Sequence, residues 1–308
     1  MKRTYRLIIG IAFVQILLTA ANSRAQSTIV YGFAARQTTL NGYDLFTDSY
    51  NSGDTNRSSA GLYDPAKAGD LGNVWSEGGI LNSIGVGNVS IWGKLTTGSS
   101  YSLQMGPDSS IGSMAWHQSG QLGIQPGYLQ TGFMWQFPDV LLPFTTWMEP
   151  AGGTYDGESY NYLLNTGDYR LSSLNLSGNE KMVVAGSARL YVPDELSLKG
   201  NATLRILPGA QLILFVGAET ANISGTGIVN EGVARQFIYF GLPGNHTLNL
   251  RFTTPLIGLI YAPQAICYVT AKGNAAAEME GVVIVQEVEL GAALRFHYDE
   301  AVNGGTPR

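Results

Sequence analysis

The sequence has few charged residues and is short of basic ones. Charged residues make up 13% of its 308 residues, about half the usual share of a globular protein. Basic residues number 18 and acidic residues 23, and residues 1–25 hold four of the basic ones and none of the acidic ones. From residue 26 onward the chain therefore carries 14 basic against 23 acidic residues. This balance excludes the usual basic surface for nucleic acid, so no nucleic-acid partner is expected.

Cysteine is almost absent. Cys267 is the single cysteine, so it cannot form an internal disulfide or supply a thiolate zinc site alone. It lies in the apolar run 265–269. This setting predicts a buried thiol that behaves as a small apolar side chain rather than as a nucleophile.

Long apolar runs are absent after the first 25 residues. There, Lys2, Arg3 and Arg6 precede an apolar run over 7–21, and the small residues Ser23 and Ala25 follow. This order is typical of a secretory signal peptide, with cleavage expected after Ala25. No later run is long enough to cross a bilayer. We therefore expect one domain over 26–308, without a transmembrane segment, in the periplasm, at the cell surface or secreted.

Helical periodicity is also absent. From residue 27 onward, short runs that alternate apolar and polar residues end at glycine or asparagine. Residues 174–176 run into Ser177-Gly178-Asn179, and residues 196–198 run into Lys199-Gly200-Asn201. The alternation of apolar and polar residues indicates strands with one buried and one solvent-exposed face. The sequence therefore predicts an all-β protein, either a parallel β-helix (β-solenoid) or a β-sandwich.

Two observations favour the solenoid. Between Leu81 and Pro138 only Lys94 and Asp108 are charged. In stacked parallel layers, equivalent side chains lie about 4.8 Å apart, so like charges repel whereas neutral polar side chains can bond. The second observation is spacing. Gly178 and Gly200 are 22 residues apart, and the triplets 204–206, 250–252 and 294–296, centred on arginines, are 46 and 44 apart, about two such intervals.

Residues 127–160 break this pattern with aromatic residues and prolines. Pro138 and Pro143 exclude a central strand there. We expect this insertion to cover one side or end of the solenoid. In the alternative interpretation, Tyr128, Trp135 and Trp147 form a platform that stacks on sugar rings.

A second irregular stretch is predicted over 41–75, which is rich in Asp, Asn, Ser and Gly. Asp48, Asn51 and Asp54 could bind calcium, which prefers oxygen ligands. The acidic residues lack the alternating spacing of known calcium loops. A hydrogen-bonded polar loop is therefore the favoured interpretation, and no cofactor is expected.

Short motifs along the chain carry a resemblance to a family. They are Thr47-Asp48-Ser49-Tyr50, Gly61-Leu62-Tyr63-Asp64, Tyr261-Ala262-Pro263 and Phe296-His297-Tyr298-Asp299. Together they resemble an uncharacterised bacterial exported domain, a domain of unknown function found in secreted and pilin-associated proteins. The resemblance implies a right-handed β-solenoid outside the cytoplasm and implies no catalytic residues. Relatives often begin with a prepilin-like anchor, and the ordinary signal peptide of this chain argues against a pilus subunit.

The residue patterns of polysaccharide-cleaving β-helix enzymes are missing. Glycoside hydrolysis usually needs two carboxylates that flank the scissile bond. The Asp-Asp, Asn-x-Asp and Gly-His-Gly motifs of polygalacturonase-like enzymes do not occur in the sequence. Arg205, Arg251 and Arg295 could form an outward ladder that supplies the base of a lyase, but acidic residues near them are sparse.

We therefore predict a structural or adhesive protein of the bacterial cell envelope without a catalytic site. Its partner would be a cell-envelope polymer, a glycan or another copy of the chain, because extended flat faces bind through many weak contacts. Two alternatives stay open. One is a carbohydrate-binding module that uses the aromatic residues of 128–147, and the other is a polysaccharide-active enzyme with an unfamiliar site.

Overall fold

The computed structural model describes residues 31–134 and 136–303. The predicted signal peptide (residues 1–25), its cleavage site after Ala25, and Trp135 lie outside these residues. Within them, no helix combines the length and the apolar character needed to span a membrane.

Nearly all regular structure in the described residues is β-strand, which confirms the all-β prediction. The strands of the N-terminal part, residues 31–130, are β1 (Phe33–Thr39), β2 (Leu45–Tyr50), β3 (Val74–Ser76), β4 (Gly79–Leu81), β5 (Val89–Trp92), β6 (Leu95–Thr96), β7 (Ser102–Leu103), β8 (Ser110–Gly112), β9 (Gly123–Ile124) and β10 (Leu129–Gln130).

The C-terminal part, residues 151–303, continues in the same way. Its strands are β11 (Ala151–Tyr155), β12 (Glu158–Leu164), β13 (Gly167–Arg170), β14 (Ser173–Leu176), β15 (Lys181–Val184), β16 (Ser187–Val192), β17 (Glu195–Leu198), β18 (Thr203–Ile206), β19 (Gln211–Val216), β20 (Thr220–Gly225), β21 (Gly227–Asn230), β22 (Phe237–Gly241), β23 (Thr247–Phe252), β24 (Leu256–Ala271), β25 (Ala277–Leu290) and β26 (Leu294–Asp299). The short helices are α1 (Met114–Gln118), η1 (Pro65–Lys67), η2 (Ala234–Gln236) and η3 (Glu300–Asn303).

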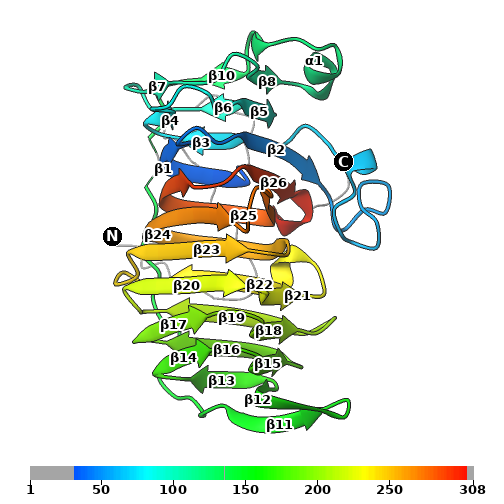
Figure 1. Cartoon of the computed structure of the whole chain (residues 1–308), viewed down its shortest axis with the longest axis vertical. Helices are drawn as coiled ribbons and strands as arrows, with labels where there is room; N and C mark the ends of the chain where they lie inside the picture. The colour runs from blue at the N-terminus through cyan, green and yellow to red at the C-terminus, as the bar shows by residue number, and fades with distance from the viewer. Residues whose placement is uncertain (1–30, 135, 304–308) are drawn as a thin grey trace, which may run out of the picture.

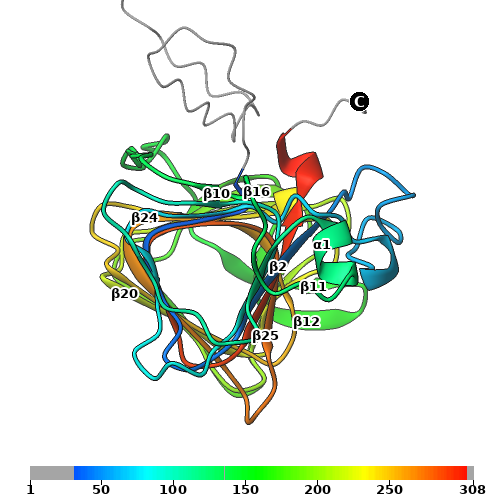
Figure 2. The same ribbon diagram turned by 90° about the horizontal axis from the view of Figure 1, so that it is seen from above.

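Most strands pair with a strand of the next layer rather than with the strand that follows them in sequence. β1 pairs in parallel with β3 and β4, and β2 pairs with β5. The next layer repeats this pattern with the pairs β3–β6, β4–β7 and β5–β8. Figure 2 shows the result, a three-sided arrangement of strands around a shared interior. One parallel sheet contains 21 strands. A second, mixed sheet contains β11, β12, β15, β18 and β21, with β11 antiparallel to β12.

Each of the three sides is a stack of strands. Side one contains β10, β6, β3, the start of β1, the middle of β25 and β24, and then β22, β19, β16 and β13. Side two contains β7, β4, the second halves of β1, β25 and β24, and then β23, β20, β17 and β14. Side three contains β9, β8, β5, β2, β26, the first residues of β25 and β24, and the second sheet.

The first and last strands of the chain meet halfway along the molecule. β1 pairs with β25, and β2 pairs with β26 from Leu45↔Leu294 to Tyr50↔Asp299. In Figure 1 the blue strands lie beside the orange and red ones, while strands from the middle of the chain occupy the two ends. We call the contact of β1 and β2 with β25 and β26 the junction. The N-terminal part extends from it in one direction and the C-terminal part in the other.

Apolar side chains from all three sides fill the interior. Phe33, Trp75, Phe237 and Phe296 are among the largest fully buried ones. Cys267 also lies in this core, and burial raises the pKa of its thiol to about 12. A thiol with so high a pKa is a poor nucleophile, in agreement with the predicted buried role.

The 22-residue interval is confirmed in two strand pairs, β14–β17 and β15–β18, whereas the predicted arginine ladder is wrong. Leu174 pairs with Leu196, 22 residues later. The next layers are longer, since Leu196 pairs with Ala221 and Ala221 with Leu248. Loops of different length between the strands shift the register of the sequence repeat. As a result, the three arginines do not form one ladder: the strands β18 and β26 that carry two of them lie on side three, whereas β23, which carries Arg251, lies on side two.

The irregular stretch predicted over 41–75 contains a central strand, β2, and is wrong to that extent. Asp48 and Ser49 made this segment look like a loop, but both are buried in the sheet. Their side chains bond to His297 and Glu300 at the other end of the chain, which satisfies them there. Residues 51–70, which we call the 51–70 loop, contain no strand and include η1.

The predicted aromatic insertion is an extended segment that runs along side one. Residues 131–150, which we call the strap, connect β10 to β11 and contain no strand among their described residues, whereas β11 and β12 occupy the end of the predicted 127–160 interval. Phe137 packs edge-on against Trp75, and Phe144 packs edge-on against Phe215. The Tyr261 hydroxyl donates a hydrogen bond of 2.7 Å to the Pro138 carbonyl. These contacts are those expected of a covering segment.

The strap offers a direct test of this packing. Phe144 is buried between the strap and β19, so Phe144→Ala should lower the free energy of unfolding by about 3–5 kcal/mol. Leu141, in the same segment, is 81% exposed, and Leu141→Ala should change it by no more than about 0.5 kcal/mol. Guanidinium denaturation of both variants provides the comparison. Similar losses in the two variants would show that the strap is not packed through Phe144.

Candidate functional site

Residues from three of the sequence motifs meet on the outer face of the junction. Asp48 in β2 lies in register with His297 in β26, which in turn lies in register with Glu280 in β25. The neighbouring residue Phe296 points into the core, so His297 points outward, because side chains alternate along a strand. Tyr63 of the 51–70 loop stacks on His297. We call Asp48, Tyr63, Glu280 and His297 the junction cluster.

The junction cluster is tightly hydrogen-bonded. Nδ1 of His297 lies 2.6 Å from Oδ1 of Asp48, and the Tyr63 hydroxyl donates to Oδ2 of Asp48, also at 2.6 Å. The rings of Tyr63 and His297 are stacked with their centroids 3.6 Å apart. The backbone N–H of Tyr63 donates to Oε2 of Glu280 at 3.4 Å. One loop residue thus contacts all three of the strand residues.

Further contacts hold the 51–70 loop to the end of β26. Asp299 accepts hydrogen bonds from the backbone N–H and the hydroxyl of Ser52 at 2.9 and 2.7 Å. Arg57 forms an ion pair of 2.6 Å with Glu300, which also accepts a hydrogen bond from Ser49. The loop is therefore fastened at three points to residues more than 200 positions away in sequence.

Burial changes the acid–base properties of this region. Burial raises the pKa of the Glu280 carboxyl, while its hydrogen bond from Tyr63 and the charge of His297 act in the opposite direction. Burial also raises the pKa of the Asp299 carboxyl. Burial and the hydrogen bond to Asp48 raise the pKa of the Tyr63 hydroxyl, which therefore stays protonated as a donor.

The geometry of the junction cluster suits fastening rather than catalysis. A carboxylate that binds one ring nitrogen of histidine fixes the orientation of that ring. Here the side chains of His297 and Asp48 are only 5% and 1% exposed, and the Tyr63 ring lies over them. The arrangement can therefore hold the 51–70 loop on the sheet.

The sequence motifs contain Asp48, Tyr63 and His297 but do not indicate that these residues are in contact. Asp48 was a candidate calcium ligand, and Asp48 and His297 belonged to two separate motifs of the family resemblance. Glu280 was missed, and Tyr63 had no role beyond its motif. The register that joins the two motifs, Asp48 with His297 and Tyr50 with Asp299, is visible only in the structure.

The three candidate calcium ligands make separate contacts. Asp48 bonds to His297 and Tyr63, Asn51 accepts a hydrogen bond from the Gly53 backbone, and Asp54 accepts one from the Asn56 backbone. These are the bonds of a polar loop. The calcium site stays a prediction.

The predicted sugar-stacking residues are only partly available. Tyr128 is half-buried and packs against the core. Trp147 is 42% exposed, and the Arg170 guanidinium lies 5.4 Å from its ring centroid. With Trp135 outside the described residues, Trp147 is the member of the set whose ring the structure places at the surface.

The remaining residues of the family motifs either bind the strap or lie in the core. The Tyr261 hydroxyl binds the strap, as described above, and the adjoining Ala262 and Pro263 are buried in β24. Tyr298 points into the core and lies in register with the buried Ser49, and Ala262 belongs to the same core. Tyr50 lies in register with Asp299 and packs edge-on against Tyr63 of the 51–70 loop.

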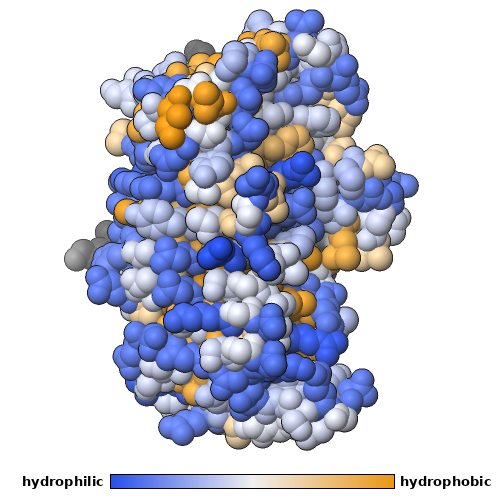
Figure 3. Space-filling view, in the orientation of Figure 1, coloured by the Kyte–Doolittle hydropathy of each residue, from blue (hydrophilic) through white to orange (hydrophobic). Residues whose placement is uncertain are grey.

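Side two carries a row of neutral polar side chains. Asn175, Ser197, Asn222 and Asn249 follow one another in register from β14 to β23. The Asn249 side-chain amide donates to that of Asn222 at 2.9 Å. We call these four residues the polar ladder. In Figure 3 the surface over β14, β17, β20 and β23 is mostly hydrophilic. The ladder has the neutral character predicted from the scarcity of charge.

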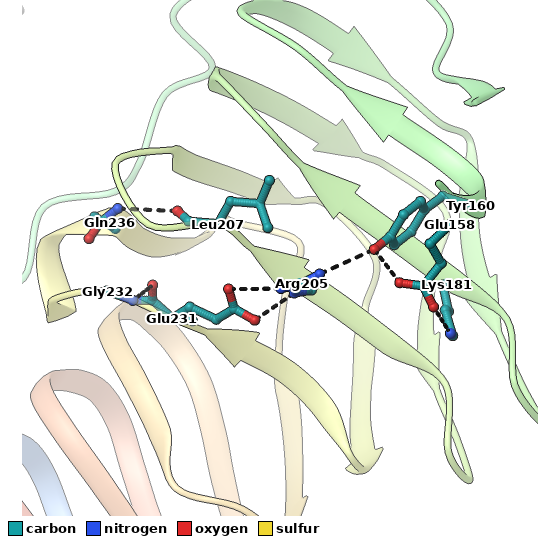
Figure 4. Close-up of polar contacts among 9 residues, drawn as sticks. Glu158, Tyr160, Lys181, Arg205, Leu207, Glu231, Gly232 and Gln236 are labelled. Atoms are coloured by element: carbon teal, nitrogen blue, oxygen red, sulfur yellow. Dashed lines mark hydrogen bonds and ion pairs between the residues drawn. The ribbon is translucent and has the colours of Figure 1, made fainter. Parts of the chain in front are cut away.

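Arg205, considered above as a possible base, is occupied by an ion pair on side three. Its Nε and Nη2 donate to the two oxygens of Glu231 at 2.5 and 3.2 Å, and Nη1 contacts the Tyr160 hydroxyl at 3.3 Å. Figure 4 shows Arg205 between these partners, with the Glu158–Lys181 ion pair beyond Tyr160. The bond to Glu231 raises the pKa of Arg205, so the guanidinium stays charged and does not act as a base.

The fold and these contacts define an all-β protein built mainly from one large parallel sheet. The family described as Domain of unknown function (DUF7305) matches residues 151–304, half of the chain. The chain belongs to this family, which agrees with the predicted resemblance to an uncharacterised domain. Searches among curated proteins and among solved structures find no match. The matched stretch includes His297 of the junction cluster and the strands of the polar ladder, but not Asp48 or Tyr63.

The hydrogen bond from Tyr63 to Asp48 can be tested by a single substitution. Tyr63→Phe keeps the ring that stacks on His297 but leaves one buried carboxylate oxygen without its donor. We expect the free energy of unfolding to fall by about 1–3 kcal/mol. Tyr43 is 42% exposed, so Tyr43→Phe serves as the control, with a change of about 0.5 kcal/mol or less. Urea denaturation measures both, and an unchanged Tyr63→Phe protein would contradict the assigned role.

Proposed function

We propose that this protein is an exported β-solenoid that serves as a structural or adhesive protein of the bacterial cell envelope. The observation that supports it best is the polar ladder on side two. Asn175 is exposed and Asn222 and Asn249 are half-buried, whereas Ser197 is buried, so three of its four members can offer neutral donors and acceptors along one face. Such a face suits a partner that repeats along its own length.

The spacing of the ladder explains how such a face would bind. Successive members lie in neighbouring parallel strands, which places them about 4.8 Å apart. Asn222 and Asn249 bond to each other and so hold their amides in one orientation. Thr220 and Thr247 lie beside them, in register with each other. An extended polymer rich in hydroxyl groups could contact several layers at once, and weak contacts then add up to useful affinity.

The solenoid part of the proposal rests on the layer-to-layer pairing. Each described layer from β1 to β8 pairs in parallel with the next through three strands. Parallel strands joined by crossover connections are right-handed in nearly all proteins, so we expect a right-handed winding. In such a solenoid the packed interior provides stability, and binding is expected on the outer faces.

Export is supported by the sequence of residues 1–25, which has the charged start, apolar middle and small-residue end of a signal peptide. The buried single cysteine is compatible with an oxidising location, because it can form no wrong disulfide. The proposed location is the periplasm, the cell surface or the medium, with the protein attached through its polymer partner.

The second candidate is carbohydrate binding through Trp147. Its support is an exposed indole ring next to Arg170, a combination that can stack on a sugar and bond to its hydroxyls. The Arg170 guanidinium covers one face of the ring, so a sugar would use the other.

Binding to insoluble glycans separates the two candidates. We would measure pull-down on peptidoglycan and on plant cell-wall polysaccharides. For a ladder site, Asn222→Ala combined with Asn249→Ala should weaken binding about ten-fold, since each lost hydrogen bond is worth about 0.5–1 kcal/mol. Thr154→Ala with Ser159→Ala, an exposed pair on the β11–β12 hairpin, should bind as the parent does.

The outcome for Trp147→Ala completes the test. Loss of binding in Trp147→Ala alone, with the ladder variant unaffected, would replace the first candidate by the second. If no variant differs from the parent on any glycan that is bound, neither surface is the binding site.

A further inference from the structure

Six asparagines in the described residues carry the acceptor signal for N-linked glycosylation. Each is followed two positions later by serine or threonine, with a residue other than proline between them, and this signal marks a surface loop in an exported protein. The six are Asn56, Asn88, Asn175, Asn201, Asn222 and Asn245. The structure distinguishes among them, because a glycan needs a side-chain amide that faces solvent and is not already bonded.

Five of these asparagines use their side chains within the fold. Asn245 is fully buried, and its amide donates to the Ala218 carbonyl at 2.7 Å. The side chains of the other four bond to residues of neighbouring layers, namely Asn88 to Asp108, Asn175 to Glu195, Asn201 to Asn179 and Asn222 to Asn249.

Asn56 is the exception. It is exposed in a turn of the 51–70 loop, and its side-chain amide has no hydrogen-bond partner among the described residues. Asp54 builds this turn: its Oδ1 accepts from the backbone N–H of Asn56, and its carbonyl accepts from the N–H of Arg57 and the hydroxyl of Ser58, all at 2.9 Å. Figures 1 and 2 show the loop projecting from the side of the molecule. A large substituent on Asn56 would therefore extend into solvent.

We propose that Asn56 is the acceptor of an N-linked glycan, with Ser58 as the second residue of the signal. The donor would be an oligosaccharide linked to a polyprenyl diphosphate, used by an oligosaccharyl transferase of the membrane. The amide nitrogen of Asn56 forms a bond to the anomeric carbon of the first sugar and loses one proton. The bond between that carbon and the diphosphate oxygen breaks, and the diphosphate leaves with its electron pair. The inference rests on the proposed export, which brings the chain to such a donor, and not on the polar ladder.

The burial of Ser58 determines when this transfer takes place. The residue is only 1% exposed, so a transferase cannot reach its hydroxyl once the loop has docked. The loop docks on the end of β26 through the Arg57–Glu300 ion pair and the bonds of Ser52 to Asp299. Transfer must therefore precede docking, and the exposed position of Asn56 leaves the attached glycan in solvent afterwards.

Mass spectrometry of the exported full chain tests this assignment. The chain would be produced with its own residues 1–25 in a bacterium that carries an oligosaccharyl transferase and its lipid-linked glycan, together with a reference acceptor protein. We expect the parent chain to gain the mass of one glycan, on the peptide that contains Asn56. Asn56→Gln and Ser58→Ala should lose this mass. Asn175 is also exposed and carries the same signal, so Asn175→Gln is the matched control and should keep the glycan.

The outcomes separate this inference from the proposed export. An exported parent chain without a glycan, in cells that modify the reference acceptor, would overturn the assignment and leave export intact. A glycan that persists in Asn56→Gln would overturn it as well. A chain that keeps residues 1–25 and stays in the cytoplasm would overturn the proposed export and this inference with it.

Discussion

The structure depends on the hydrogen bonds between the first and last strands of the chain. β1 and β2 complete the layer that β25 and β26 leave open, so two stacks of strands become one continuous sheet. An unpaired strand edge in the middle of the molecule would expose a row of backbone donors and acceptors to other chains. The junction removes that edge, and the polar side chains above it fasten the 51–70 loop over the same strands.

The fold class was readable from the sequence because it depends on local patterns. Alternation around Leu174 and Leu196 predicted strands, and the scarcity of charge predicted neutral side chains stacked in register, as at Asn222 and Asn249. A fixed repeat was not readable, because the loops between layers differ in length. The arginines at 205, 251 and 295 therefore fall on two different sides although their spacing looks regular.

The candidate site was not readable, because its parts come from distant segments. Asp48 and His297 are 249 positions apart, and nothing near either residue in sequence indicates the other. The same distance explains the error over 41–75. A strand that contains Asp48 and Ser49 looks like a loop until the partners that satisfy these side chains are known. The strap shows the opposite case, since its aromatic residues and prolines indicated a covering role without any knowledge of the partner strands.

The position of the junction also sets an order of events during biosynthesis. Among the described strands, β1 and β2 are synthesised before all the others, whereas their partners β25 and β26 follow the other strands. The N-terminal stack therefore keeps one open edge until β25 and β26 have been synthesised. Until then, β1 and β2 have an unpaired edge, as a subunit has before its partner binds. A chaperone that shields exposed strand edges would therefore bind β1 and β2.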